Sequence, residues 1–142
     1  MARYMLILQY DEAAAKASTP DPAIFEEMAA YNTAMVEAGV MLSGEGLAPS
    51  DHGVIVGFDG GEEPTVVDGP FTEAKELVGG FWILQVASRE EAVSWARRAP
   101  FRGGERIQVR RITEASDFED VAPAGVLENE ERLRERIEQQ HG

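Results

Sequence analysis

Cysteine is absent from the 142-residue sequence. Its absence excludes disulfides, thiolate nucleophiles and cysteine-ligated zinc or iron–sulfur centres, and it is consistent with a reducing compartment. Long apolar runs are missing too, because none approaches the roughly 20 residues that cross a bilayer. Near the N-terminus a short apolar run follows Arg3, but charge ends it too soon for a signal peptide. We therefore expect a cytoplasmic protein without a membrane segment.

Positive charge is scarce as well. Only 13 Lys and Arg stand against 26 Asp and Glu, so the formal net charge is -13 at pH 7. A nucleic-acid partner is not expected, since phosphate binding needs clustered basic side chains. The two histidines, His52 and His141, have no metal-ligand spacing, and no glycine pattern resembles a phosphate loop. We expect no metal and no cofactor, and a neutral, cationic or aromatic substrate.

The chain is long enough for one domain with its own core and too short for two ordinary ones. An apolar run predicts a first strand over residues 3–10, and Asp21 and Gly39 are typical of the two ends of a helix between them. A capping box formed by Ser88 and Glu91 begins a second helix, which ends before Pro100. Further strands are predicted over residues 40–43, 54–58, 64–67, 81–86 and 107–112, with 54–67 forming a hairpin.

This order of elements predicts an α+β fold, in which an antiparallel sheet of ferredoxin-like topology carries two helices on one face. The other face needs a cover, and a second subunit is the simplest one, so we expect a homodimer. The domain is expected to span residues 1–112. Residues 113–142 form an acidic tail with a charged helix, which is either solvated or a docking helix for a partner subunit.

The segment Asp68-Gly69-Pro70-Phe71 is the first candidate for chemistry. Asp-Gly before proline is common in turns, so Asp68 has an ordinary structural interpretation. In the functional interpretation, the strand end holds Asp68 at the mouth of a cleft, where apolar neighbours such as Phe71 make its carboxylate a better general base. We predict Asp68 as a catalytic base, with Gly69 and Phe71 as substrate-binding residues.

Further candidates are Lys75, Tyr10, Ser43 and Glu45. Residues 72–76 are consistent with a solvated helical turn that ends at Gly79, but Lys75 is also a candidate to polarise a carbonyl group, because a buried lysine changes its pKa more readily than arginine. Tyr10 is predicted at the end of the first strand, as a second polarising group. Ser43 and Glu45 lie near the end of another strand and are predicted to bind substrate.

The sequence resembles the DGPF-domain branch of the YCII-related proteins. The resemblance rests on Asp68-Gly69-Pro70-Phe71 with the residues that follow to Phe81, on residues 4–7 and on residues 42–47. It implies a dimeric α/β barrel of ferredoxin-like subunits. Smaller members of the family carry a paired His and Asp, but the first predicted helix here contains no histidine, so that pair is not transferred.

The resemblance implies two classes of function. Some relatives are linked to breakdown of substituted aromatics, which suggests a small-molecule-binding protein or a cofactor-independent, lyase- or isomerase-like enzyme acting on a small organic compound. Many DGPF proteins are encoded beside extracytoplasmic-function sigma factors. The alternative is therefore a non-catalytic dimeric accessory module with a regulatory protein partner.

Overall fold

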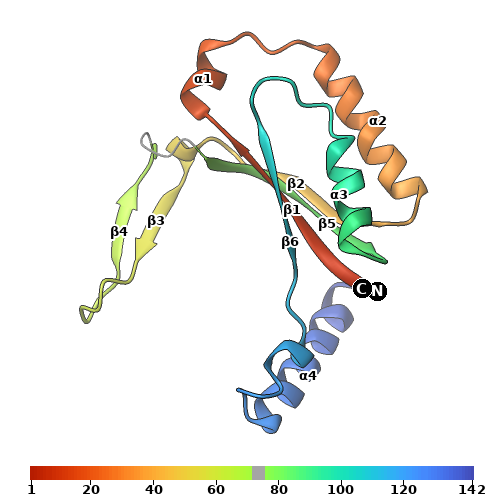
Figure 1. Cartoon of the computed structure of the whole chain (residues 1–142). Coiled ribbons are helices and arrows are strands. Elements are labelled where there is room, and N and C mark those ends of the chain that lie inside the picture. The colour runs from red at the N-terminus through yellow and green to blue at the C-terminus, as the bar shows by residue number, and fades with distance from the viewer. Residues whose placement is uncertain (72–75) are drawn as a thin grey trace. The chain divides into compact units, whose positions relative to one another are not determined.

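The structure is a computed structural model, and it describes residues 1–71 and 76–142 (Figure 1). The elements in chain order are β1 (Ala2–Tyr10), α1 (Glu12–Ala17), α2 (Ala23–Glu37), β2 (Met41–Gly46), the 3-10 turn η1 (Ser50–His52), β3 (Val54–Gly57), β4 (Thr65–Asp68), β5 (Leu77–Val86), α3 (Arg89–Arg97), β6 (Arg106–Arg111), the 3-10 turn η2 (Ala115–Phe118) and α4 (Ala124–His141). They divide into two compact units, Met1–Arg111 and Ile112–Gly142. Among the described helices, none has the length and apolar character of a membrane span.

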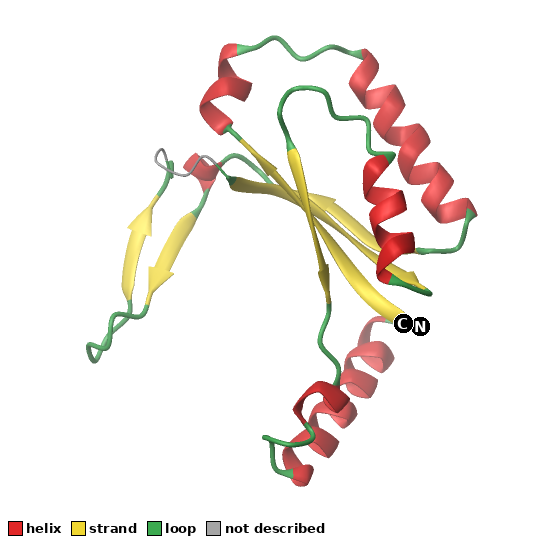
Figure 2. Cartoon of the chain, viewed as in Figure 1, coloured by secondary structure: helices red, strands yellow, loops and turns green. Residues whose placement is uncertain are grey.

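The first unit is built on a four-stranded sheet with the order β2-β5-β1-β6. The pairs β1–β5, β1–β6 and β2–β5 are all antiparallel. Helices α2 and α3 lie on the same side of this sheet (Figure 2). The predicted α+β architecture with an antiparallel sheet is therefore confirmed. The sheet of the single chain is open and does not close into a barrel.

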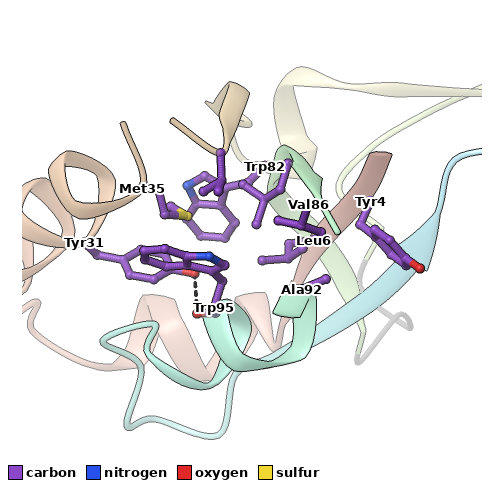
Figure 3. Packing of buried hydrophobic residues seen from close by; sticks show 10 residues of the cluster. Tyr4, Leu6, Tyr31, Met35, Trp82, Val86, Ala92 and Trp95 are labelled. Carbon is purple, nitrogen blue, oxygen red and sulfur yellow. Dashed lines mark hydrogen bonds between the residues drawn. The ribbon is translucent and has the colours of Figure 1, made fainter. Parts of the chain in front are cut away.

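The core lies between this sheet and the two helices (Figure 3). Alternate residues of the central strands point into it, and Leu6 and Leu84 are fully buried. On the helix side, the hydroxyl of Tyr31 donates to the carbonyl oxygen of Trp95 at 2.8 Å, and the Tyr31 ring meets Trp82 edge-on. Burial raises the pKa of Tyr31 to about 12. The tyrosine therefore stays protonated and holds α2 against α3.

Both predicted helix starts are found. The N–H of Ala23 donates to Asp21 at 2.9 Å where α2 begins, and Gly39 has the left-handed φ of 71° that follows its end. At α3, the N–H of Glu91 donates to the Ser88 hydroxyl at 3.1 Å. The carboxylate of Glu91 accepts from the N–H of Ala87 instead of the predicted Ser88 N–H, so the return bond lies one residue earlier.

The short helix α1 was not predicted. It begins immediately after β1, where the side chain of Asp11 accepts from the N–H of Ala14 at 3.1 Å. The predicted helical turn around Thr72–Lys75 lies outside the described residues. Its proposed end at Gly79 is wrong, because Gly79 lies inside β5, which begins at Leu77.

Strands β3 and β4 form a hairpin that is a sheet of its own. Figure 1 shows it apart from the four-stranded sheet. A glycine with φ 89°, Gly60, allows the turn at its tip. The strands carry exposed apolar side chains, which are Val54, Ile55, Val56, Val66 and Val67. We call this hairpin, residues 54–68, the arm.

The face of the sheet opposite the helices is apolar at its centre. It carries Met5 and Ile7 from β1, which pair in register with Ile83 and Phe81 of β5. All four side chains are only partly buried. We call this surface the open face.

The second unit holds helix α4, which is rich in acidic residues. An ion pair between Arg132 and Glu128 at 3.6 Å joins adjacent turns. Its apolar side chains Val126, Leu133 and Ile137 are exposed.

Candidate functional site

A pocket of about 430 Å³ lies where β1 ends, β5 begins and the turn η1 passes. Its walls are mostly apolar, with Leu47, Pro49, Leu77 and Val78 among them. The polar groups that line it are Tyr10, Glu12, Ser50 and His52, and the ring of Phe71 completes the wall. An apolar hollow with a few fixed polar groups is the usual form of a small-molecule site. We call it the Glu12 pocket.

Glu12 is the one buried carboxylate among the described residues, with 9% of its surface exposed. The backbone N–H of Ser50 donates to it at 3.1 Å and the Ser50 hydroxyl at 2.9 Å. Lys16, one turn later in α1, lies 3.5 Å away. The Ser50 N–H, more than any other contact, holds the pKa of Glu12 below its usual range. Glu12 is therefore ionised at neutral pH and firmly positioned.

Tyr10 stands beside this carboxylate at the end of β1. Its hydroxyl donates to Glu12 at 3.4 Å, which is a long hydrogen bond. Burial and the negative charge of Glu12 raise the pKa of Tyr10, so the phenol keeps its proton. The ring packs over Gly79 of β5, where a Cβ would lie 2.8 Å from the ring. Tyr10 is thus a protonated hydrogen-bond donor that lines the pocket.

The Asp-Gly-Pro-Phe segment is fastened to the same turn. The N–H of Phe71 donates to the Ser50 hydroxyl oxygen at 3.0 Å, and the N–H of Gly69 donates to the Gly53 carbonyl oxygen at 2.9 Å. A Cβ at Gly69 would lie 1.8 Å from the Ser50 carbonyl oxygen, so only glycine fits there. The motif therefore sets the position of Ser50, and through Ser50 that of Glu12.

Residues 2–116 match the family model of the YCII-related domain. The chain belongs to the YCII-related family. One relative is Uncharacterized protein R00369 of Rhizobium meliloti (strain 1021), which is 31% identical over 96 residues, or 66% of this chain and 77% of the relative. Both the Glu12 pocket and the arm lie within the YCII-related domain.

The predicted site residues of this YCII-related chain do not all meet in one place. Tyr10 and Phe71 come together in the Glu12 pocket, and Gly69 lies against its turn. Asp68 is exposed at the end of β4 and does not line this pocket. Lys75 lies outside the described residues.

The two predicted residues of β2 lie elsewhere in the YCII-related domain. Ser43 pairs in register with Ile83, and Glu45 pairs with Phe81. Glu45 lines a smaller hollow of about 230 Å³ together with Asn32 and Trp82. These positions belong to a different part of the sheet surface from the Glu12 pocket.

Sequence reasoning missed Glu12, Ser50 and His52 as site residues. Glu12 and Ser50 are 38 positions apart in the sequence, and neither residue belongs to a local pattern that predicts their contact. The one available signal was an acidic residue just beyond the end of a strand. His52 is exposed in η1, with Asp51 at 3.7 Å. Among the described residues, no group of three potential ligands could hold a metal ion.

Proposed function

We propose that the Glu12 pocket binds a small organic molecule that is neutral or cationic and carries an aromatic ring or a carbonyl group. The observation that carries the proposal is the buried carboxylate of Glu12, fixed by two donors from Ser50 beside the Tyr10 hydroxyl. The apolar wall suits a ring or aliphatic body, and the ionised carboxylate disfavours an anionic ligand.

The polar groups divide naturally between binding and proton transfer. Tyr10 keeps its proton and is suited to donate a hydrogen bond to a ligand carbonyl or phenol. Glu12 is a weak base, because its pKa lies below the ordinary value, and it is suited to positioning Tyr10 and attracting positive charge. His52 also lines the pocket, and its ring nitrogens can donate or accept a hydrogen bond.

These roles support a cofactor-independent proton transfer of the lyase or isomerase class. The base is either His52, which already lines the pocket, or Asp68, as the sequence suggested. Asp68 is exposed in the single chain, so its participation requires a cover supplied by another subunit. Tyr10 is the polarising group in both versions.

We also propose that the chain is a DGPF-branch member with ferredoxin-like topology and pairs with a second copy through the open face. The strand order, with both helices on one side of the sheet, supports the topology. The apolar centre of the open face, formed by Met5, Ile7, Phe81 and Ile83, supports the homodimer. In this arrangement two open sheets would form the barrel that one chain lacks.

A thermal-shift screen with phenols, ketones and aromatic amines tests the binding proposal. We expect at least one class of compound to raise the Tm of the wild type. Tyr10→Phe should raise the dissociation constant of that compound by about tenfold, because the variant loses only the hydroxyl donor. Ser94→Ala, at an exposed position of α3 away from the pocket, serves as the control and should bind normally. If no compound stabilises the wild type, or if Tyr10→Phe binds every ligand as tightly, the proposal is wrong.

The alternative proposal is a non-catalytic accessory module for a sigma-factor-linked regulatory system. The acidic α4 with its exposed Val126, Leu133 and Ile137 favours it, because such a helix can lay an apolar stripe into a partner's groove. Substituting Leu133→Lys would abolish capture of a regulatory partner under this proposal. It would leave ligand binding in the Glu12 pocket unchanged.

A further inference from the structure

The arm exposes apolar side chains on both faces of its two-stranded sheet. Directly paired residues share a face, so Val54, Val56 and Val66 lie on one face and Ile55 and Val67 on the other. All five are about half exposed or more, and Val66 is 65% exposed. An isolated hairpin is marginally stable at best, and a patch of this kind on a folded protein marks an interaction site.

The base of the arm is fixed even though its strands are uncovered. The N–H of Gly69 donates to Gly53, which precedes β3, and the Gly69 α-carbon packs against the Ser50 carbonyl. Phe71 contacts Gly53 from the same side, since a Cβ on that glycine would meet the ring at 3.6 Å. The arm therefore leaves the domain from a held position, as a preorganised contact element does.

Charge indicates what the arm contacts. Between residues 54 and 68 it carries four acids and no base, namely Asp59, Glu62, Glu63 and Asp68. The chain as a whole is strongly acidic, yet the β1 and β6 side of the open face carries Arg3, Arg106 and Arg110, which share that face with Met5 and Ile7 by register. Arg106 also pairs with Glu76 at 2.9 Å, and the β2 side of the face carries Glu45. The chain thus presents, on one molecule, an acidic apolar arm and an apolar surface that is basic along its β6 side.

We infer that the arm clasps a second copy of this chain, with its apolar strands on the partner and its acidic tip beside the arginines of the partner's β1 and β6. A two-fold dimer makes each contact twice, which covers both arms. Asp68 pairs directly with Val54 and shares the face of Val56 and Val66. Contact on that face encloses the Asp68 carboxylate in apolar surroundings, so the second copy completes the environment that a general base requires.

The inference rests on the homodimer proposed above and not on any ligand. A failed ligand screen therefore leaves it standing, and its own failure leaves the Glu12 pocket as a binding site. The two can be told apart because one is measured by ligand stabilisation and the other by self-association of the full chain.

The test is sedimentation equilibrium of the full chain and of Val56→Thr/Val66→Thr. Threonine keeps the β-branched shape that suits a strand but adds a hydroxyl to the contact face. We expect the dimer dissociation constant to rise by at least about tenfold. The control is Val36→Thr/Val121→Thr, two exposed valines outside the arm, which should dimerise as the wild type does.

Amide hydrogen exchange of the wild-type protein, measured at concentrations above and below the dimer dissociation constant, gives an independent test. Amides of residues 54–57 and 65–68 should exchange at least about tenfold more slowly in the dimer. Three results would overturn the inference. The wild type could be monomeric at every concentration, in which case the arm would bind a different protein. The arm amides could exchange equally fast in monomer and dimer, or the arm variant could dimerise as tightly as its control.

Discussion

Gly69 is the residue at which one added methyl group has the largest expected effect. The Ser50 carbonyl oxygen would lie 1.8 Å from an alanine Cβ there, and a backbone atom cannot rotate away as a side chain would. We expect Gly69→Ala to lower the free energy of unfolding by about 3 kcal/mol or more. Chemical denaturation measures it.

The matched control for Gly69→Ala is Gly46→Ala. Gly46 is an exposed glycine of β2 with open space around its α-carbon and no positive φ. Alanine there should be neutral within about 1 kcal/mol. Equal losses in the two variants would contradict the fit of Gly69 against the turn η1.

Glu12 makes the stability of the folded chain depend on pH. Its pKa is lowered in the folded chain, so the ionised group adds stability that is complete above the ordinary glutamate value of about 4.3. That stability is lost as pH falls through the lower folded-state pKa. Glu12→Gln should therefore lower the Tm by several degrees at pH 7, with the gap between the two proteins closing as the pH falls below about 4.3.

Melting curves of wild type and variant across this pH range measure the gap. Glu130→Gln, at an exposed position of α4, should follow the wild type throughout. A gap for Glu12→Gln that is the same at pH 7 and pH 3 would show that the stabilising form of Glu12 is not the carboxylate.

At the residue scale, sequence reasoning found the groups that stand in local patterns. Phe71 and Gly69 belong to a compact motif, and Tyr10 ends a clear strand, so all three were named. Glu12 and Ser50 could not be paired in advance, because their contact depends on how the η1 turn folds back to the start of α1. Chemistry that depends on such a tertiary contact has no spacing signature.

At the scale of elements, helix caps are the clearest prediction. Ser88 accepts the N–H of Glu91 in the first turn of α3, so Ser88→Ala should cost about 1 kcal/mol of stability. Ser94→Ala, an exposed position in the same helix, should cost nothing, since alanine is the better helix former. Equal Tm losses for both would contradict the cap.

The elements also show where periodicity stops being informative. The strands and helices of the sheet layer were predicted because alternating or helical spacing places apolar side chains in one core. Strand β5 is longer than predicted, because Gly79 was interpreted as a helix end. The close approach of Tyr10 to Gly79 and of β2 to Gly80 favours glycine at both positions. Here a tertiary contact selects glycine inside a strand.

At the scale of the whole molecule, the chain leaves apolar surfaces that one copy does not cover, the open face and the arm. The predicted topology indicated that a second copy covers the open face, because the two helices cover only one face of the sheet. It did not single out the arm as a candidate for contact, since alternating valines in a hairpin are equally typical of an ordinary sheet.

The central claim is that the Glu12 pocket is the ligand site, and amide chemical-shift mapping of the isotope-labelled full chain tests it most directly. With a compound that raises the Tm, the account predicts the largest shifts at the amides of Tyr10, Glu12, Ser50 and Phe71, with saturation at a single site. Shifts gathered instead around Asn32 and Trp82, or spread without saturation, would contradict it.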